Sequence, residues 1–481
     1  MDVILKIVQT VNAYLSDYIL IFLLVGIGIF YTVKTRFVQV RCFGEGFRRV
    51  FGNFTMKGGK QKGGISSFQA LATAIAAQVG TGNIVGACGA ILLGGPGAIF
   101  WMWVIAFFGM ATNYSEAVLA QKTRLVGEDG SVAGGPVYYI KKAFNNKFGN
   151  FLAGFFATAV ILALGFMGSM VQSNSIAENF TGAVSKSFGI DIPGWVIGII
   201  LAVFASFIFV GGIQRIASVT EKMVPIMAGL YIVGGLLVLG LNFKSIPEAF
   251  VMIFKYAFVP NAIIGGSIGY ALKQAISQGA KRGLFSNEAG MGSTPHAHAM
   301  ANVKDPHEQG VTAIIAVFID TFVVLTMTAM VVITTLYTKG GILENGVAPV
   351  GVDKTNMVQI AFTQTFAKLF GEQAGQIIGS LFVAVCLFFF AFSTILGWNF
   401  FGKVNANYLF GKKSTLIYSI ISVAFIFLGT CLSNDLVWEL TDMFNNLMVI
   451  PNVIAMFALS SLVVSSVKFK KKKEIDATKN Q

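Results

Sequence analysis

The chain alternates between long apolar stretches and short polar connections along almost its whole length. Because a transmembrane helix needs roughly 20 predominantly apolar residues, this pattern predicts about eleven spans. They lie near residues 15–34, 65–90, 95–120, 151–178, 194–212, 218–242, 261–300, 310–337, 372–402, 414–432 and 440–467. Such stretches recur throughout, so neither a cleaved signal peptide nor a single anchor explains them. The pattern predicts an all-α polytopic membrane protein, embedded in a lipid bilayer.

The order of the spans indicates an internal repeat. After the first span, the rest divide into two groups of about five, residues 65–242 and 261–467, and each group opens with a segment interrupted by glycines and polar residues. Because each group holds an odd number of spans, the second group begins on the opposite side of the membrane from the first. We therefore expect two inverted repeats. Residues 1–64 would add an extra N-terminal helix and a basic cytoplasmic loop, and residues 468–481 a basic cytoplasmic tail.

The distribution of basic residues predicts the orientation of the chain in the membrane. The net charge of +13 would suggest a nucleic-acid partner in a soluble protein, but the basic residues collect in connections beside apolar spans. The connection over residues 34–62 and the tail "KFKKKKE" are strongly basic, whereas "LLGGPG" and "CLSND" contain no Lys or Arg. We therefore expect a protein of the cell membrane, with its N-terminus outside, its C-terminus cytoplasmic and no nucleic-acid partner. The four cysteines have no CxxC spacing and predict no metal site.

The first interruption is the segment "QVGTGN". Gly80 and Gly82 allow the helix to unwind there, and Gln78, Thr81 and Asn83 supply polar side chains. Non-helical backbone at membrane depth is tolerated only where it lines a cavity or is buried in protein. Freed carbonyls can bind a cation, and the N–H groups of a half-helix attract a carboxylate. Glycines can also serve close helix packing, but packing does not need the polar residues, so we favour a binding site.

The second interruption, residues 277–299, combines four glycines and a proline with charged residues. Charged groups at membrane depth are costly and usually face a cavity or a partner, so Glu288 and the neighbouring Asn287 are candidates for a coupling or a structural role. Glu288 could carry a proton, or it could form an ion pair with Lys281 or Arg282. Both possibilities remain open from the sequence.

Two further polar clusters lie in otherwise apolar spans. "FMGSMVQSNSIAEN" contains Gln172, and "FAFSTILGWN" places Trp398 four residues after Thr394, on the same helix face. Ser393 adds a second hydroxyl beside Thr394. Either cluster alone could be a hydrogen-bonded helix contact. Together with two interrupted helices, they favour the wall of one central cavity.

Three segments resemble a known family. "GGPGAIFWMWVIAFFG", "TGNIVG" and "GLFSNEAGMGSTPHAHA" are similar to signature segments of the alanine or glycine:cation symporters, the sodium:alanine symporter family, and the resemblance spans residues 15–465. It implies a leucine-transporter-type fold with ten core helices in two inverted repeats, of which the first and sixth are discontinuous. It also implies sodium-coupled import of small neutral amino acids, chiefly alanine and glycine, by alternating access, without an enzymatic step.

The resemblance extends to the site. "VGTGN" is similar to the "VGLGN" type of segment in sodium-coupled amino-acid transporters, which implies that Thr81 and Gly82 hold the substrate carboxylate. The position of Asn83 resembles one that serves a second sodium ion in some relatives. Sodium is expected to bind the carbonyls of Ala76 and Val79 and the hydroxyls of Ser393 and Thr394, since oxygen ligands suit a hard cation. Substrate contacts are expected from Gln78, Gly80, Thr81, Gly82, Asn83, Gln172, Phe285 and Trp398.

Three alternatives compete with sodium symport. A proton-coupled amino-acid symporter would use Glu288 as the proton carrier. An ion channel is disfavoured, because channels usually build their pores from symmetric subunits or rings of charge or carbonyl groups. A membrane-embedded enzyme is disfavoured too, because the three histidines all lie between residues 296 and 307 and no HExxH motif occurs. Sodium is expected as the coupling ion, and no cofactor is expected.

Overall fold

The computed structural model of the chain describes residues 2–52, 64–128, 132–259 and 268–467. The N-terminal half contains the α-helices α1 (Asp2–Tyr14), α2 (Ile21–Lys34), α3 (Val38–Arg41), α4 (Phe43–Phe51), α5 (Ser67–Gln78), α6 (Ala87–Gly94), α7 (Ala98–Thr123), α8 (Pro136–Ala143), α9 (Lys147–Val160), α10 (Ser169–Phe188), α11 (Gly194–Val210) and α12 (Gly212–Leu241). The C-terminal half contains α13 (Ile246–Phe258), α14 (Ile268–Asn287), α15 (Pro295–Met300), α16 (Pro306–Val317), α17 (Thr326–Val332), α18 (Met357–Phe370), α19 (Glu372–Phe410), α20 (Ser414–Gly429), α21 (Asn434–Ala458) and α22 (Ser460–Val464).

Several long helices contain turns of wider winding. The π-helical segments are η1 (Leu15–Leu20), η2 (Gly82–Gly86), η3 (Ile161–Gly168), η5 (Phe318–Leu325) and η6 (Ile333–Tyr337), and η4 (Phe243–Ser245) is a 3-10 turn. π-Segments inside α-helices frequently mark functional sites. The strands β1 (Leu125–Val126) and β2 (Val132–Ala133) pair antiparallel as one short hairpin.

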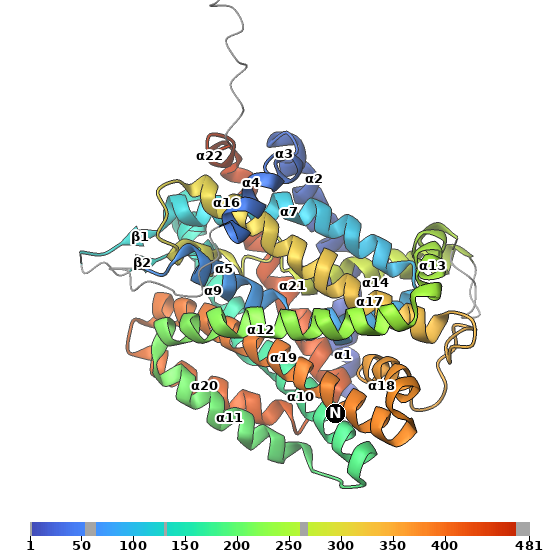
Figure 1. Cartoon of the computed structure of the whole chain (residues 1–481). Coiled ribbons are helices and arrows are strands. Elements are labelled where there is room, and N and C mark those ends of the chain that lie inside the picture. Colours follow the sequence, from blue (N-terminus) through green and yellow to red (C-terminus); the bar gives the residue numbers. More distant parts are fainter. Residues whose placement is uncertain (1, 53–63, 129–131, 260–267, 468–481) are drawn as a thin grey trace, which may run out of the picture.

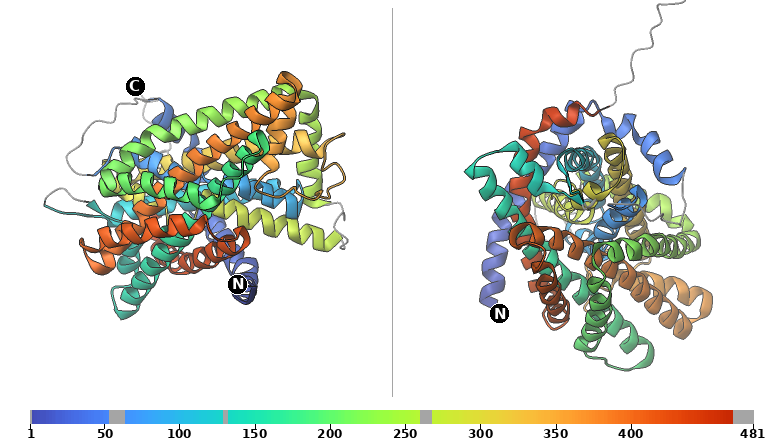
Figure 2. Two further views of the ribbon diagram at one scale, coloured as in Figure 1. Left: turned by 90° about the horizontal axis from the view of Figure 1, so that it is seen from below. Right: turned by 90° about the vertical axis from the view of Figure 1, so that its left-hand side faces the viewer.

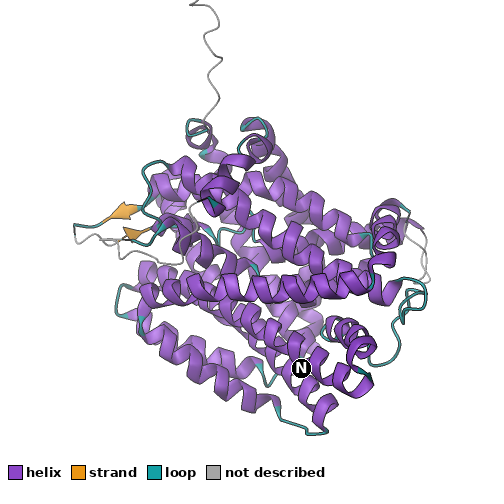
Figure 3. Cartoon of the chain, in the orientation of Figure 1, coloured by secondary structure: helices purple, strands orange, loops and turns teal. Residues whose placement is uncertain are grey.

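The helices run roughly side by side, from the end that carries β1 and β2 to the end that carries α13 (Figure 1). Viewed along this direction, many of them are seen end-on (Figure 2, right). The described chain is mostly helical, and most of its loops are short; a longer connection, residues 338–356, leads from η6 to α18 (Figure 3). This arrangement confirms the prediction of an all-α protein built from packed apolar helices.

Length and hydropathy qualify a subset of the described helices as membrane spans. Six helical runs pass, or seven when α5 and the run Gly82–Gly94 are counted as one bent span. The shorter apolar helices α2, α11 and α20 also coincide with predicted spans. The prediction of a polytopic membrane protein is thereby supported, while the number eleven and the inverted repeats stay predictions.

Both interrupted segments break their helices. A capping box begins α5, in which Ser66 and Gln69 bond reciprocally, and α5 ends at Gln78 with a 47° bend to the following helix. The second break follows α14. There Glu288 has φ +55°, and Gly290 and Gly292 have φ of +86° and +81°. This left-handed conformation suits glycine and rarely suits other residues, so Glu288 is held by its surroundings.

Some boundaries differ from the sequence prediction. The first helical run begins at Asp2, and the basic connection after it contains α3 and α4, which the prediction treated as loop. The short helices α8, α13 and α18 were not predicted either. A window of roughly 20 apolar residues detects spans and misses short or amphipathic helices. Part of the basic loop (53–63), the start of the second predicted repeat (261–267) and the tail lie outside the described residues.

Candidate functional site

The two helix breaks meet inside the molecule. The side-chain Nε2 of Gln78 donates a 2.6 Å hydrogen bond to the backbone carbonyl of Asn287. A Cβ added at Gly82 would lie 3.1 Å from the Phe285 ring and 3.1 Å from the Cα of Ser286. These residues are all buried. Segments about 200 positions apart thus form one polar interior.

The backbone of the first break is held by side chains. The N–H of Gly80 donates to Asn83 Oδ1 at 3.0 Å, and the N–H of Thr81 donates to Gln172 Oε1 at 3.1 Å. Gln172 comes from α10, so it reaches the break as the sequence pattern predicts. The neighbouring hydroxyls on α10 do not, because Ser173 donates to a carbonyl of its own helix.

Three of the four expected sodium ligands lie together. The Thr394 hydroxyl on α19 donates to the carbonyl of Ala76 at 2.8 Å and lies 3.4 Å from the carbonyl of Val79. The Ser393 hydroxyl donates to Phe390 O at 2.9 Å, a carbonyl that Thr394 Oγ1 also contacts at 3.1 Å, and it lies 3.3 Å from the sulfur of Met227. The structure therefore brings the Thr394 hydroxyl to the carbonyls of Ala76 and Val79, and among these described residues the Ser393 hydroxyl bonds to neither of the two.

Unpaired polar atoms gather beside these oxygens. Among the described residues, the buried side-chain atoms without a hydrogen-bond partner include Gln78 Oε1, Thr81 Oγ1, Gln172 Nε2 and Asn287 Nδ2. Leaving a buried polar atom unpaired costs about 1–3 kcal/mol, so a cluster of such atoms favours a site that a polar ligand completes. The amide nitrogens can donate to a carboxylate, and the amide and hydroxyl oxygens can accept from an ammonium group.

Two aromatic rings border this cluster. Phe285 packs edge-on against Trp398, with ring centroids 6.1 Å apart, and its ring is tilted by 41° against that of Trp438, at 5.0 Å. Both predicted aromatic residues therefore lie in one wall. A Cβ at Gly168 would collide with the Trp398 ring, so the ring also packs closely against η3.

Glu288 is buried in the same region. One carboxylate oxygen accepts from Ser293 Oγ at 2.6 Å, and the other accepts from the indole Nε1 of Trp398. Arg282, which the sequence offered as an ion-pair partner for Glu288, instead pairs with Asp442 at 3.2 Å. Asn287 uses its own Oδ1 to accept from the N–H of Ala289. Glu288 thus connects the second break to α19.

Asp320 is a residue that sequence reasoning missed. It lies fully buried in η5 and accepts from Asn83 Nδ2 at 2.6 Å, from Ser286 Oγ at 3.0 Å and from Thr321 Oγ1 at 2.8 Å. Its donors come from the first break, the end of α14 and its own segment. The available signal was an acidic residue within the predicted span 310–337.

Glu116 on α7 was missed in the same way. Its carboxylate accepts from the N–H groups of Gly290 and Gly292, both at 2.9 Å, and from Asn452 Nδ2 at 2.7 Å. Charge-assisted hydrogen bonds from backbone N–H groups are stronger than neutral ones. Glu116 therefore fixes the unwound backbone of the second break, and again a lone acid in an apolar span was the signal.

Known proteins resemble this chain over its whole length. The model of the sodium:alanine symporter family matches residues 1–481. The chain is 40% identical over 465 residues to the sodium/alanine symporter AgcS of Methanococcus maripaludis, covering 96% of each. It is 39% identical to the putative sodium/proton-dependent alanine carrier protein YrbD of Bacillus subtilis, covering 96% of this chain and 91% of the relative. It is 36% identical to the probable sodium/glutamine symporter GlnT of the same organism, covering 96% and 90%.

A solved structure has a similar fold. MhsT in complex with L-phenylalanine superposes with a TM-score of 0.58, covering 85% of this chain and 100% of that one, at 13% sequence identity. At this identity the likeness concerns the fold alone. It supports the expected leucine-transporter-type fold.

Proposed function

Because the chain belongs to the sodium:alanine symporter family, we propose that it is a sodium-coupled symporter that imports small neutral amino acids such as alanine or glycine. The family and its relatives are transporters, so the protein is a multi-pass membrane transporter of amino acids and not an enzyme. The observation that carries the finer proposal is the cluster of unpaired buried polar atoms beside the Thr394, Ala76 and Val79 oxygens.

The substrate carboxylate would bind at the first break. The N–H of Thr81 already donates to an amide oxygen, that of Gln172. A substrate carboxylate would take the place of this oxygen, and rotation of the Gln172 amide would direct its Nε2 to the same carboxylate. The half-helix that begins at Gly82 adds a favourable dipole. Phe285 and Trp398 would enclose the substrate side chain.

Sodium would bind where the first break meets α19. The carbonyls of Ala76 and Val79 and the hydroxyl of Thr394 are hard oxygen ligands, which such a cation prefers. Because both carbonyls belong to the segment that also holds the substrate, sodium would stabilise the substrate-binding conformation. Linkage then requires the substrate to strengthen sodium binding by the same factor.

The proposed orientation places the N-terminus outside and the basic connection containing α3 and α4 in the cytoplasm. The outer route to the site would then pass Phe285. Beyond it, Arg282 pairs with Asp442, and its guanidinium lies 4.9 Å from the ring centroid of Trp438. Opening this contact would admit substrate, and tilting of the broken helices against the scaffold would release it inward.

Uptake of labelled alanine into proteoliposomes tests this function. An inward sodium gradient is expected to drive accumulation, and an equal potassium gradient is not. Thr394→Val is expected to raise the sodium concentration for half-maximal uptake about 10- to 100-fold, since a hydrogen bond or ligand contact to a charged group contributes about 1.5–3 kcal/mol.

Ser393→Ala is the matched control for Thr394→Val. Both replacements remove one buried hydroxyl from α19, but of the two hydroxyls the structure brings only that of Thr394 to the carbonyls of Ala76 and Val79. Its sodium dependence should stay near that of the unmodified protein. Equal uptake rates with and without the sodium gradient would reject sodium coupling altogether.

Proton-coupled uptake is a second candidate function. It is favoured by the burial of Glu288 between Ser293 and Trp398, at the wall of the proposed substrate site. For that function, Glu288→Gln should remove the pH dependence of uptake, because glutamine keeps the shape but carries no exchangeable charge. Glu248→Gln, on the exposed first turn of α13, should keep that dependence. Unchanged rate and pH dependence in Glu288→Gln would leave this residue a structural role only.

A further inference from the structure

Three potential metal ligands come together at the end of the molecule opposite α13, near the start of α16. Cys42 lies between α3 and α4, Glu45 is on the first turn of α4, and His307 is on the first turn of α16. One ligand atom from each lies within 4.8 Å of the other two. We infer that Cys42, Glu45 and His307 form a binding site for a divalent transition-metal ion, for which zinc is the best match.

The spacing of two ligand atoms fits a tetrahedral metal centre. His307 Nε2 lies 3.4 Å from Glu45 Oε2, which is long for a hydrogen bond. Two ligands that are each about 2.1 Å from a tetrahedral zinc ion stand about 3.4 Å apart. The sulfur of Cys42 lies within 4.8 Å of both other ligand atoms, so a shift of at most about 1 Å would bring it to zinc-binding distance.

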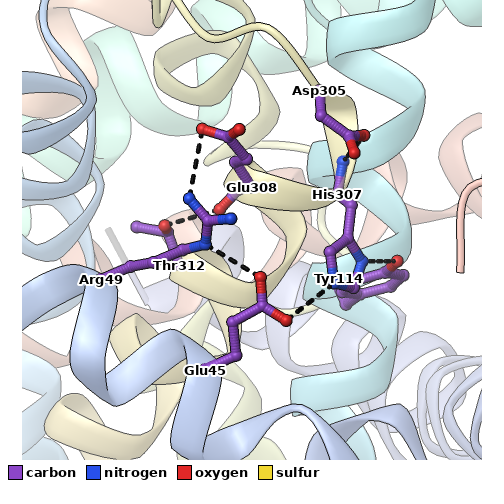
Figure 4. A network of polar contacts seen from close by, with 7 residues as sticks. All are labelled: Glu45, Arg49, Tyr114, Asp305, His307, Glu308 and Thr312. Carbon is purple, nitrogen blue, oxygen red and sulfur yellow. Dashed lines mark hydrogen bonds and ion pairs between the residues drawn. The ribbon is translucent and has the colours of Figure 1, made fainter. Parts of the chain in front are cut away.

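Neighbouring side chains hold two of the ligands, Glu45 and His307, in position (Figure 4). The Tyr114 hydroxyl bonds to His307 Nδ1 at 2.7 Å and leaves Nε2 directed at Glu45, an arrangement common for metal-binding histidines. Asp305 accepts from the backbone N–H of His307 at 3.0 Å. Arg49 donates to the other Glu45 oxygen at 3.0 Å, which fixes the carboxylate.

Charge and access also suit a dication. Three carboxylates, those of Glu45, Asp305 and Glu308, lie near two guanidinium groups, those of Arg41 and Arg49. A zinc ion displaces the proton of a thiol ligand, and the resulting Cys42 thiolate would bring the net charge of these groups to −2, which the ion balances. Cys42 and His307 are buried, whereas the Glu45 side chain is 31% exposed. Solvent can therefore deliver the ion and a water as the fourth ligand from the Glu45 side.

A bound ion would join two parts of the fold. A Cβ at Gly46 would lie 2.5 Å from the carbonyl of Val311, so α4 already packs directly on α16. The ligands come from both sides of this contact. Metal binding would lock α4 onto α16 and should raise the melting temperature with increasing zinc concentration, because the ion binds the folded state.

Titration of the purified full-length protein tests the site without any transport assay. With its affinity tag removed, the protein is expected to bind one equivalent of zinc, and cobalt in its place should give a thiolate-to-metal charge-transfer band. Cys42→Ser should lose the band and at least about 10-fold in zinc affinity. Glu45→Gln, at a partly exposed position, should weaken affinity similarly while the metal-free protein melts normally.

Cys431→Ser is the matched control, since Cys431 is an exposed thiol outside the cluster. It should keep both the band and the affinity. A band that persists in Cys42→Ser and disappears in Cys431→Ser would locate the metal on a surface thiol and overturn the site. Absence of the band in the unmodified protein would mean that the three groups form only a hydrogen-bonded network, which overturns it as well.

Discussion

Gly80→Ala is expected to reduce sodium-driven uptake on the order of 10- to 100-fold at limiting sodium, because a Cβ at this position has no room. The added atom would collide with the Thr394 hydroxyl and lie 3.1 Å from Thr394 Cβ and 3.2 Å from Gln172 Oε1. Those atoms define the proposed sodium site and the proposed carboxylate site. Relief of the collision must separate Thr394 from the carbonyls of Ala76 and Val79.

Gly86→Ala provides the control in the same broken helix. A Cβ there meets nothing closer than 3.8 Å, the carbonyl of Thr81, which is ordinary contact. Both variants exchange glycine for alanine in the same buried segment, so their difference isolates the collision with Thr394. Uptake measured against sodium concentration separates them. Matching sodium curves for the two variants would contradict the proposed position of the ion.

The sequence predicted the breaks well because hydrocarbon makes unwound backbone costly. Glycines with polar neighbours inside an apolar stretch are tolerated only at buried or cavity-lining positions, and the helices do end at Gln78 and Asn287. The pairing of the breaks with Gln172, Phe285 and Trp398 followed from the same reasoning and from the family resemblance. The functional roles of these residues stay predictions until binding or transport is measured.

The sequence could not predict contacts that depend on the direction in which a side chain points. Ser393 and Thr394 are adjacent, but successive side chains on a helix point about 100° apart, and only the structure shows which hydroxyl meets Ala76. Glu116 and Asp320 are single acids in apolar windows, and their partners lie on other elements. A one-dimensional pattern can mark such acids as functional candidates, but it cannot name what they contact.

Three buried carboxylates surround the second break and tie it to different parts of the fold. Glu116 holds its backbone from α7, Glu288 connects it to Trp398 on α19, and Asp320 connects the end of α14 to Asn83 of the first break. Movement of the broken helices must therefore either break the hydrogen bonds of these carboxylates or move the bonded partners together with the helices. We therefore expect transport to depend on the charge of these three groups, and so on a bound cation or proton.

Asp320→Asn is expected to lower uptake at limiting sodium on the order of 100-fold, the largest effect among the carboxylate variants. The substitution removes the formal charge of the group that accepts from Asn83 and Ser286. It also replaces one acceptor oxygen with an NH2 group, which is a donor and therefore opposes the donors of these two residues. Loss of even one such buried charged bond costs about 1.5–3 kcal/mol, and the misplaced donor adds to it. Asp320→Glu, which keeps the charge, should recover part of the uptake.

Asp191→Asn is the control, because Asp191 is exposed and bonds only locally, to Ser185. Uptake titrated with sodium at several pH values separates the two roles open to Asp320. A cation ligand requires a shift in sodium dependence with little change in pH dependence, whereas a proton carrier requires the loss of pH dependence. If Asp320→Asn transports like Asp191→Asn under all these conditions, Asp320 does not couple either ion, and its bond to Asn83 serves only to join the first break to η5.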